Sequence, residues 1–253
     1  MSKSVIAFFK RYWITLLIFA GMAIFYWAMS ASGTSDAVLF PKVQEIGAAL
    51  KAYLKDIPIN VASSFRLLIP SFLISAALAI AIGVPMGLNQ RVRDALYPVI
   101  YAISVVPAIL LSPFALHLAP DFGSASLFMI VYATIWATLF STINGVMTID
   151  KRFLDNAATL KLTGFNKLVH VILPAAMPSI MSGLVTSLRG SFLMLVFVEM
   201  YGTNHGLGFF VKKSADLGFY DDTWAGFIVM VIVLVAVMLL FEKFKNYVLR
   251  WTI

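Results

Sequence analysis

The sequence predicts an all-α integral membrane protein with about six transmembrane helices. The first observation is its composition: 61% of the 253 residues are hydrophobic, only 12% are charged, and the mean hydropathy is +0.92. A soluble domain of this length has too little interior to bury so much apolar surface, so lipid must form part of its solvent. The second observation is that the apolar residues gather into six stretches. Each is close to the roughly 20 residues that a helix needs to cross the hydrocarbon core.

The predicted spans run, in order, over residues 12–30, 67–88, 96–118, 126–147, 175–202 and 224–241. The first is longer than a typical signal core and no small-residue cleavage pattern follows it closely, so we expect it to be retained. Prolines interrupt the third span at Pro98, Pro107 and Pro113, and the fifth at Pro174 and Pro178. Such prolines are tolerated where neighbouring helices satisfy the freed backbone groups. Gly83 and Gly87 in the second span have the spacing of a close helix–helix contact.

The distribution of basic residues predicts the orientation. With the N-terminus inside, twelve Lys and Arg lie on the inner side and six on the outer side, and Arg189 alone lies within a span. This bias places both termini in the cytoplasm. Small polar residues at 30–36 and the Gly-rich stretch 202–208 predict outer connections. We expect one membrane domain over 1–253, with an N-terminal span and outer segment at 1–66 and a core bundle at 67–253.

Several classes of function are disfavoured by what the chain contains. Cysteine is absent, which excludes a disulfide framework and a thiol site. The net charge of +7 is spread between the apolar runs, whereas a nucleic-acid binder concentrates its basic residues on one face. The three histidines lie on different segments without acidic or thiol ligands at suitable spacing, so no metal site is expected. No phosphate-binding loop of the G-x-x-x-x-G-K-[ST] type occurs, so any energy from ATP must come through another chain.

The connection between the fourth and fifth spans is unusually long and helical in composition. Within it, Leu154, Ala157, Ala158 and Leu162 recur at helical spacing and predict a small apolar ridge on a basic helix. Thr163-Gly164 predicts a turn, since glycine accepts the backbone angles that end a helix. Periodicity alone favours an amphipathic loop on the lipid headgroups, with a docking helix as the alternative.

The stretch from Asp155 to Pro178 resembles the EAA loop of the permease subunits of ATP-driven (ABC) importers. The residues that match the loop's acidic position, small pair, glycine turn and Leu-Pro-x-x-x-Pro exit are Asp155, Ala157, Ala158, Gly164, Leu173, Pro174 and Pro178. Weaker similarities to the nitrate, sulfonate and taurine permease group extend the resemblance over residues 40–251. They comprise Val106-Pro107 with Pro113, Phe122-Gly123, residues 195–199 ending in Glu199, and Gly206-Leu-Gly208.

The resemblance implies a site that couples the permease to an ATPase. Its residues here would be Asp155, Ala157, Ala158, Lys161, Gly164 and Pro174. Two of them depart from the family pattern, because Asp155 stands where glutamate is usual and Lys161 where glycine is most frequent. The shorter carboxylate and the lysine put the detailed shape of the loop in question. An ATPase with a matching acidic contact would accommodate Lys161.

The resemblance also implies the partners and the role. The chain would be a transport subunit rather than an enzyme, with no cofactor of its own, since separate ABC ATPase subunits would bind ATP and Mg²⁺. A periplasmic or lipid-anchored solute-binding protein would deliver the solute, and two copies of the chain would form a homodimer in the bacterial inner membrane. The solute would be a small organic or inorganic anion such as a sulfonate, nitrate or carboxylate.

Arg189 and Glu199 are the two charges predicted within a span, and both are candidates for the substrate pathway. Burying either at the bilayer centre costs about 2.5–3.5 kcal/mol, so each should face protein or water. Ten residues on one helix separate them by about 15 Å and roughly 80°, so they cannot pair with each other. For Arg189, a structural pair and an attraction for anionic solute remain equal alternatives. For Glu199, a role in a gate or in helix packing is favoured.

Two other classes of function remain as alternatives. An ion-coupled secondary transporter would normally hold acidic residues near the bilayer midplane, whereas here Glu199 is the single candidate and lies off-centre. Uptake that depends on an ion gradient, without a co-purifying ATPase, would favour that class. A membrane-embedded enzyme would need a cluster of acid, base or metal-binding groups, and candidates such as Asp150 and Asp155 have no such neighbours in sequence.

Overall fold

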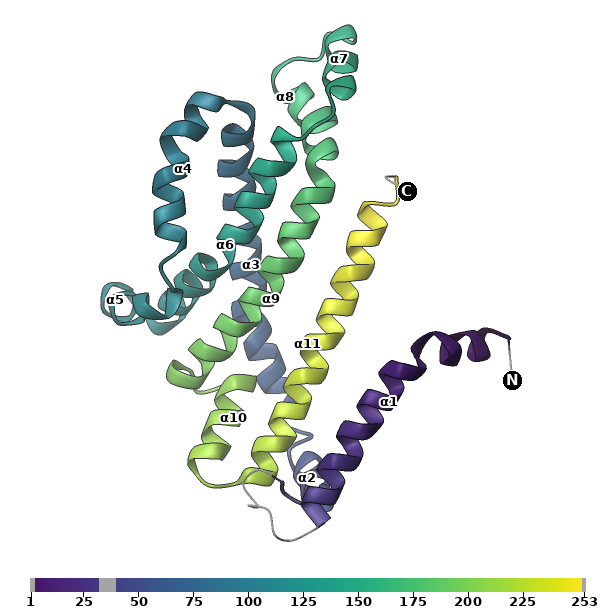
Figure 1. Cartoon of the computed structure of the whole chain (residues 1–253). Helices are drawn as coiled ribbons and strands as arrows, with labels where there is room; N and C mark the ends of the chain where they lie inside the picture. The colour runs from purple at the N-terminus through teal and green to yellow at the C-terminus, as the bar shows by residue number, and fades with distance from the viewer. Residues whose placement is uncertain (1–2, 32–39, 252–253) are drawn as a thin grey trace.

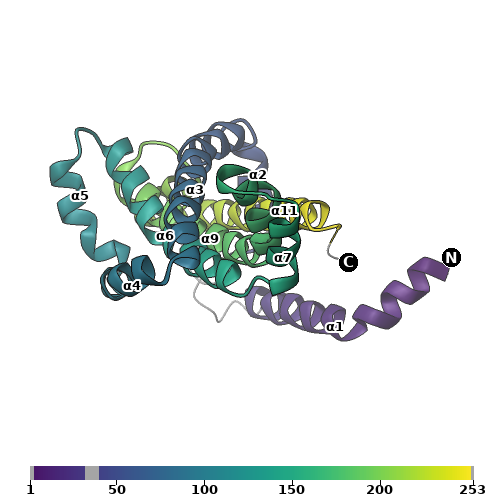
Figure 2. The same cartoon turned by 90° about the horizontal axis from the view of Figure 1, so that it is seen from above.

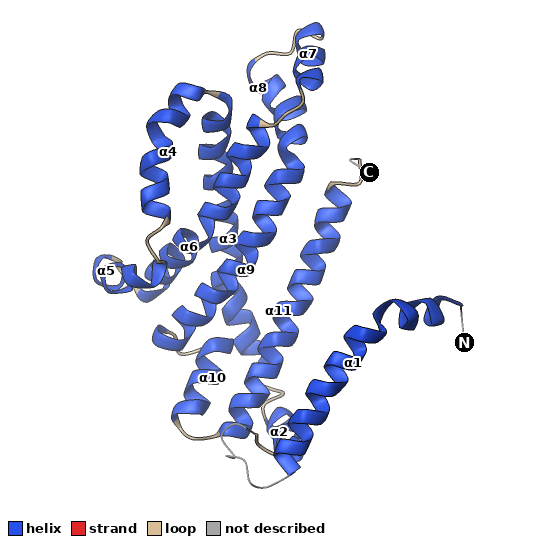
Figure 3. Ribbon diagram, viewed as in Figure 1, coloured by secondary structure: helices blue, strands red, loops and turns tan. Residues whose placement is uncertain are grey.

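The computed structural model describes residues 3–31 and 40–251, and within them every regular element is helical (Figure 3). Residues 32–36 of the predicted first connection lie outside this description. The α-helices are α1 Lys3–Ala31, α2 Val43–Ala52, α3 Ile57–Leu88, α4 Gln90–Ser104, α5 Ser112–Leu118, α6 Phe122–Met147, α7 Lys151–Thr159, α8 Gly164–Lys167, α9 Leu173–Gly202, α10 Leu207–Asp216 and α11 Tyr220–Val248. Helices α1, α3, α6, α9 and α11 are long and apolar enough to cross a membrane. The prediction of an all-α membrane protein with about six spans is confirmed.

Helices α3, α6 and α9 form the centre of the bundle (Figures 1 and 2). Buried hydroxyls join them, since the Thr134 hydroxyl donates to the Ser75 hydroxyl over 3.0 Å and Thr138 and Ser187 share a hydrogen bond of 2.7 Å. Small residues let the backbones approach closely. A Cβ added at Gly83 would lie 2.8 Å from the Cβ of Thr142 on α6, as expected from its spacing. These three helices are therefore fixed to one another by polar contacts inside an apolar core.

The predicted third span is not one straight helix. The chain bends by 82° between Gln90–Ser104 and Ala108–Leu118, so the stretch predicted as the third span is a broken span or a re-entrant loop, interrupted at Pro107, one of the prolines expected to interrupt it. Pro107 is the cause, because it has no N–H and because its ring disfavours a helical conformation of the residue before it. The Tyr132 hydroxyl of α6 donates to the carbonyl of Ile103 over 2.6 Å, which satisfies one of the backbone groups freed at the bend.

The N-terminal helix stands apart from the bundle (Figures 1 and 2). No residue in the apolar window of its span at Tyr12–Ala31 is buried. It touches the rest of the chain near its end, where the ring of Tyr26 lies 5.3 Å from that of Trp224 and its hydroxyl donates to the carbonyl of Pro41. Lipid or another chain must therefore cover most of this helix.

The remaining spans differ from the prediction at their ends. Helix α3 begins at Ile57, ten residues before the predicted start, so Arg66 lies inside this helix rather than in a connection. Pro70 and Pro85 remain inside α3 and Pro178 inside α9 without ending either helix. The α7–α8 segment lies at one end of the bundle, and α2, α10 and the start of α11 lie at the opposite end (Figure 1). The predicted inner and outer segments are thus separated along the bundle.

Candidate functional site

Residues 150–172, which we call the elbow, project beyond the ends of α6 and α9 (Figure 1). Asp150 begins the elbow as the N-cap of α7 and accepts a hydrogen bond from the backbone N–H of Arg152 over 2.9 Å. The Arg152 guanidinium also pairs with this carboxylate at 2.7 Å. The side-chain hydrogen bond from Arg152, and then the backbone one, hold the pKa of Asp150 below its usual value. The N-cap therefore stays charged at the helix terminus, where a negative charge is favourable.

The turn that follows α7 is centred on Lys161 rather than on the predicted Thr163-Gly164. The N–H of Leu162 donates to the carbonyl of Ala157 over 2.9 Å and that of Lys161 to Ala158 over 3.0 Å, the pattern of a Schellman C-cap. This motif needs a left-handed residue, and Lys161 supplies it with φ = 52°. The frequent glycine at this position of the EAA pattern thus has a conformational reason. Gly164 also has φ = 52° and begins the next helix.

The elbow turns a different face outward from the one predicted. Of the predicted ridge, Ala157 is 1% exposed, and Leu154 and Leu162 are half-buried against the rest of the chain, whereas Ala158 is exposed. The outward apolar side chains are Phe153, Leu160 and Phe165, exposed by 50%, 70% and 76%. Asp155 is exposed as well. Sequence spacing identified the amphipathic helix, but the turn at Lys161 brings Leu160 and Phe165 to the surface.

The elbow is continuous with α9. A π-helical turn at Leu168–Ile172 leads directly into Leu173, and Pro174 is the second residue of α9. Ile172 and Ala176 are buried in one apolar cluster with residues of α3 and α6. The helix runs without a break from Gly164 to Gly202, so the second part of the elbow and α9 form one continuous helical segment.

Arg189 lies on an exposed face of α9. Ser182, Thr186 and Leu193 are also exposed and lie at helical spacing from it, so they share that side of the helix. Among the residues that the structure describes, no carboxylate forms an ion pair with Arg189. A charged and hydroxyl-bearing face is unsuited to lipid and is expected to face protein or a water-filled cavity.

Glu199 is completely buried at the other end of α9. One carboxylate oxygen accepts a hydrogen bond of 2.8 Å from the N–H of Gly208, at the start of α10. A Cβ added at Gly206 would lie 2.5 Å from the Glu199 carboxyl carbon, so the loop fits around this side chain because residue 206 is glycine. This packing favours the structural role considered for Glu199 over a place on an open pathway. The structure does not bring Arg189 and Glu199 together.

Two partners of this loop were missed by sequence analysis. The N–H of Gly206 donates to the side chain of Asn60 and that of Leu207 to the hydroxyl of Ser64, both over 3.0 Å. Asn60 and Ser64 lie more than 140 residues away on α3, so no local pattern could link them to the loop. We call Asn60, Ser64 and Glu199, with the loop 206–208 that they hold, the outer clasp.

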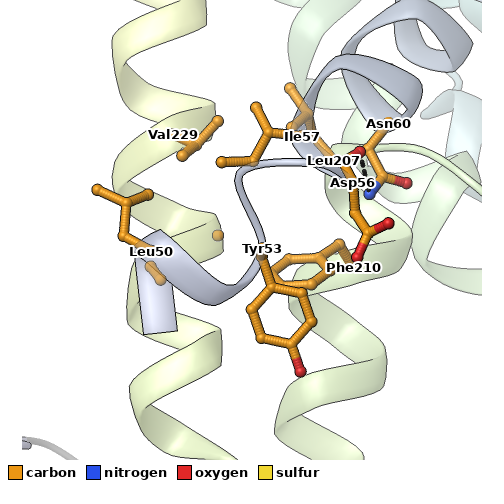
Figure 4. Close-up of a pocket in the computed structure, with 10 residues that line it drawn as sticks. Leu50, Tyr53, Asp56, Ile57, Asn60, Leu207, Phe210 and Val229 are labelled. Carbon is orange, nitrogen blue, oxygen red and sulfur yellow. Dashed lines mark hydrogen bonds between the residues drawn. The ribbon is translucent and has the colours of Figure 1, made fainter. Parts of the chain in front are cut away.

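A small pocket beside the outer clasp is mostly apolar (Figure 4). Leu50, Ile57, Leu207, Phe210 and Val229 line it, and Tyr53, Asp56 and Asn60 form its polar rim. The Asn60 amide donates to the carbonyl of Asp56, as the dashed line in Figure 4 shows. The pocket lies at the junction of α2, α3, α10 and α11. Its lining has no convergent charged groups. Within the described residues, no group of three potential metal ligands occurs either.

Comparison with known proteins shows that this chain is similar to transport proteins. The family profile described as "Binding-protein-dependent transport system inner membrane component" matches residues 57–252, which leaves α1 and α2 outside the match. The nitrate import permease protein NrtB of Leptolyngbya laminosa is 30% identical over 159 residues, covering 63% of this chain and 57% of the relative. The bicarbonate transport system permease protein CmpB of Synechococcus elongatus is 29% identical over 181 residues, covering 71% and 64%. The chain thus spans less than two thirds of the length of these two relatives.

Two further similarities extend the comparison. The permease protein SsuC of Bacillus subtilis, named for aliphatic sulfonates transport, is 26% identical over 229 residues, covering 88% of this chain and 83% of the relative. A chain of the MetNI methionine ABC transporter, solved in inward-facing conformations, matches with a TM-score of 0.59 at 14% identity, covering 73% of this chain and 94% of the other. The last similarity concerns the fold alone.

Proposed function

This chain belongs to the family of binding-protein-dependent transport system inner membrane components, and on that premise we propose that it is the permease subunit of an ATP-driven importer. The observation that carries the proposal is the elbow, an exposed segment at one end of the bundle whose second part, from Gly164, continues without a break into α9. A separate ATPase subunit binds ATP and Mg²⁺, docks on the elbow and moves it when nucleotide binds. Rigid displacement of α9 then opens the transport pathway to alternate sides.

The docking surface consists of Phe153, Leu160 and Phe165. Their exposure leaves apolar area at the elbow end of the molecule, which we infer to project into the cytoplasm. Aromatic and aliphatic anchors of this kind dominate the energy of protein interfaces when a partner pocket receives them. Asp155 and Lys161 are exposed on the same segment, and we infer that they set the register of docking by charge.

Serine substitutions at the elbow test the docking surface. We expect L160S and F165S each to weaken retention of the co-expressed ATPase by more than about tenfold, since a buried interface anchor contributes about 2 kcal/mol or more. The matched control is L217S, because Leu217 is 58% exposed at the opposite end of the chain. ATPase retention is measured by co-purification at increasing dilution. Equal retention by L160S, F165S and L217S would contradict the proposal.

For the solute, we propose a small anion that passes along the exposed face of α9. The names of three relatives specify nitrate, bicarbonate and sulfonates, all of which are anionic at neutral pH. Arg189 provides a fixed positive charge on this face, and Ser182, two turns away, provides a hydroxyl donor. The hydroxyl of Thr186, one turn away, donates to the carbonyl of Ser182 and keeps its oxygen as an acceptor. Two copies of the chain, placed with these faces opposed, form the cavity, and a solute-binding protein delivers the anion from the outer side.

Removal of the Arg189 charge tests the solute class. In proteoliposomes that contain the complete importer, we expect R189Q to lower ATP-driven anion uptake by about tenfold or more, as for the loss of one charge-assisted hydrogen bond in a low-dielectric site. The control is R66Q, which removes an exposed arginine from another span. Unchanged uptake with unchanged affinity in R189Q would exclude the role for Arg189. It would leave the importer assignment intact, because that rests on the elbow.

We also propose that the protein lies in the bacterial inner membrane with both termini in the cytoplasm. The excess of basic residues on the elbow side supports this orientation. Because the chain has no cysteine, L160C and L217C each introduce a unique label site. A membrane-impermeant thiol reagent should label residue 217 in intact cells from outside and residue 160 only after permeabilisation, and the reverse pattern would invert the topology.

A further inference from the structure

A hollow lies between α4 and α6, at the end of the bundle that carries the elbow and away from the outer clasp. Its volume is about 1120 Å³, part of which is open to solvent. Its lining residues are Arg93, Asp94, Tyr97, Pro98, Phe140, Ile143, Asn144 and Met147. Helix α4 has no buried residue, so it stands off from the bundle and leaves this space beside α6. The transport mechanism proposed above does not use the hollow.

The hollow combines an apolar floor with a rim of both charges. Tyr97 and Phe140 form the floor, with their rings 5.8 Å apart in an edge-to-face arrangement. Arg93 at the rim donates to the carbonyls of Met86 and Gly87 through one nitrogen, which leaves other N–H groups of its guanidinium available. Asp94 and Asn144 are exposed, and within the described part of the chain their side chains have no hydrogen-bond or ion-pair partner. The rim therefore offers the guanidinium of Arg93, the carboxylate of Asp94 and the amide of Asn144, which form no hydrogen bonds with one another.

The position of the hollow in the bundle indicates what can reach it. Arg93 and Asp94 lie in the first turns of α4, and Asn144 and Met147 lie in the last turn of α6. Both sets are at the end of a membrane-crossing helix, at the depth where lipid headgroups meet the protein. Basic pockets between membrane helices at this depth are suited to phospholipid headgroups.

We propose that this hollow binds the headgroup of phosphatidylethanolamine. Arg93 binds the phosphate, Asp94 and the Asn144 carbonyl accept hydrogen bonds from the primary ammonium, and Tyr97 with Phe140 lies along the start of an acyl chain. Phosphatidylglycerol fits the rim less well because it has no cation for Asp94. Phosphatidylcholine fits less well because its quaternary ammonium has no N–H to donate. This inference goes beyond the proposed function and does not depend on which solute is transported.

Lipid retention by the full-length protein tests the site. The protein is equilibrated with equal amounts of the three phospholipids in detergent, and the bound lipids are counted by native mass spectrometry. We expect phosphatidylethanolamine to be retained about tenfold more strongly than either competitor, the effect of one additional charge-assisted hydrogen bond. In D94N this preference should fall to about twofold or less, because the neutral amide has lost its attraction for the ammonium. Equal retention of all three lipids, or an unchanged preference in D94N, would overturn the proposal.

Two controls distinguish headgroup binding in the hollow from nonspecific lipid association. R91Q removes an arginine from the same turn of α4 that does not line the hollow, and it should leave the preference unchanged. D94N is preferred to an Arg93 variant because Arg93 also holds the carbonyls at the end of α3. Soluble phosphoethanolamine in excess should not displace the lipid, since it lacks the acyl chains that contact the floor. Displacement by this excess, or a hollow occupied by a second copy of the chain with no lipid retained, would also contradict the proposal.

Discussion

The two ends of α9 differ in their contacts: one end is held by hydrogen bonds within the chain, and the other leads into a segment with exposed apolar side chains. At the end that carries the outer clasp, Glu199 is completely buried and the loop around it is held by three hydrogen bonds from backbone N–H groups to side chains. At the elbow end, the hydrogen bonds are local, and Phe153, Leu160 and Phe165 are exposed. The outer clasp therefore makes its contacts within the chain, whereas the exposed apolar side chains of the elbow are available for contact with a partner.

The same contrast appears in the backbone. Gly206 in the outer clasp has φ = 129°, a conformation that is almost confined to glycine, and Glu199 occupies the space that a side chain there would need. Lys161 in the elbow has φ = 52°, which a non-glycine residue adopts at moderate cost, and it stands in open surroundings. The exposed elbow therefore tolerates a left-handed lysine, whereas the closely packed outer clasp has a glycine at its left-handed position.

The largest expected effect is at Gly206. We expect G206A to destabilise the protein by about 3 kcal/mol, because the backbone is strained and the added carbon overlaps the Glu199 carboxylate. The midpoint of thermal unfolding in detergent measures this change. G218A is a suitable control, since Gly218 also has positive φ but has nothing within 4 Å of its position. A G206A variant no less stable than G218A would mean that the clasp is not closed in the membrane protein.

An intermediate effect is expected at Glu199. In E199A the buried N–H of Gly208 loses its acceptor, which costs about 1–3 kcal/mol. E199Q keeps a carbonyl oxygen in the same place and should lose less than half as much. The comparison uses the same unfolding measurement for both variants. If E199Q were as damaging as E199A while uptake fell in parallel, the charge of Glu199 would matter to transport and the packing role would be insufficient.

The smallest effect is expected at Lys161, and it has the opposite sign. K161G should stabilise the elbow by about 0.5–1 kcal/mol, because glycine adopts the left-handed conformation without a steric cost. Hydrogen exchange of the Leu162 amide, which donates to Ala157, should slow accordingly. K161A removes the charge but keeps the Cβ, so it should not slow exchange. Slowed exchange in K161A as well would indicate that the charge, rather than the backbone angle, limits the elbow.

Much of the architecture could be predicted because it depends on local sequence. Five of the six predicted spans appear as long apolar helices, and the elbow appears between the fourth and fifth spans as expected. The prolines of the third span were recognised as interruptions, but the 82° bend at Pro107 was not, because Pro70, Pro85 and Pro178 remain inside uninterrupted helices. Whether a proline bends a span depends on what its neighbours can satisfy, as Tyr132 does here.

For the candidate sites as well, the sequence indicated which segment to examine but not which of its side chains are exposed. The resemblance placed Asp155, Ala157, Ala158, Lys161, Gly164 and Pro174 in one segment, and the structure gathers them at one end of the bundle. Their part in coupling stays a proposal. The outward triad Phe153, Leu160 and Phe165 could not be read from periodicity, because the turn at Lys161 reverses the chain between its members.

The sequence by itself determined that lipid surrounds much of this protein, the approximate number and order of its membrane-crossing helices and the position of its amphipathic connection. Apolar length and helical periodicity act over one or a few turns, so a single segment is enough to show them. Only the tertiary structure decided which face of the elbow is free, where the third span bends and what surrounds Glu199. Each of these depends on contacts between residues far apart in the chain, such as Ser64 with Leu207. The energy of such contacts comes from packing and burial, which no single segment contains.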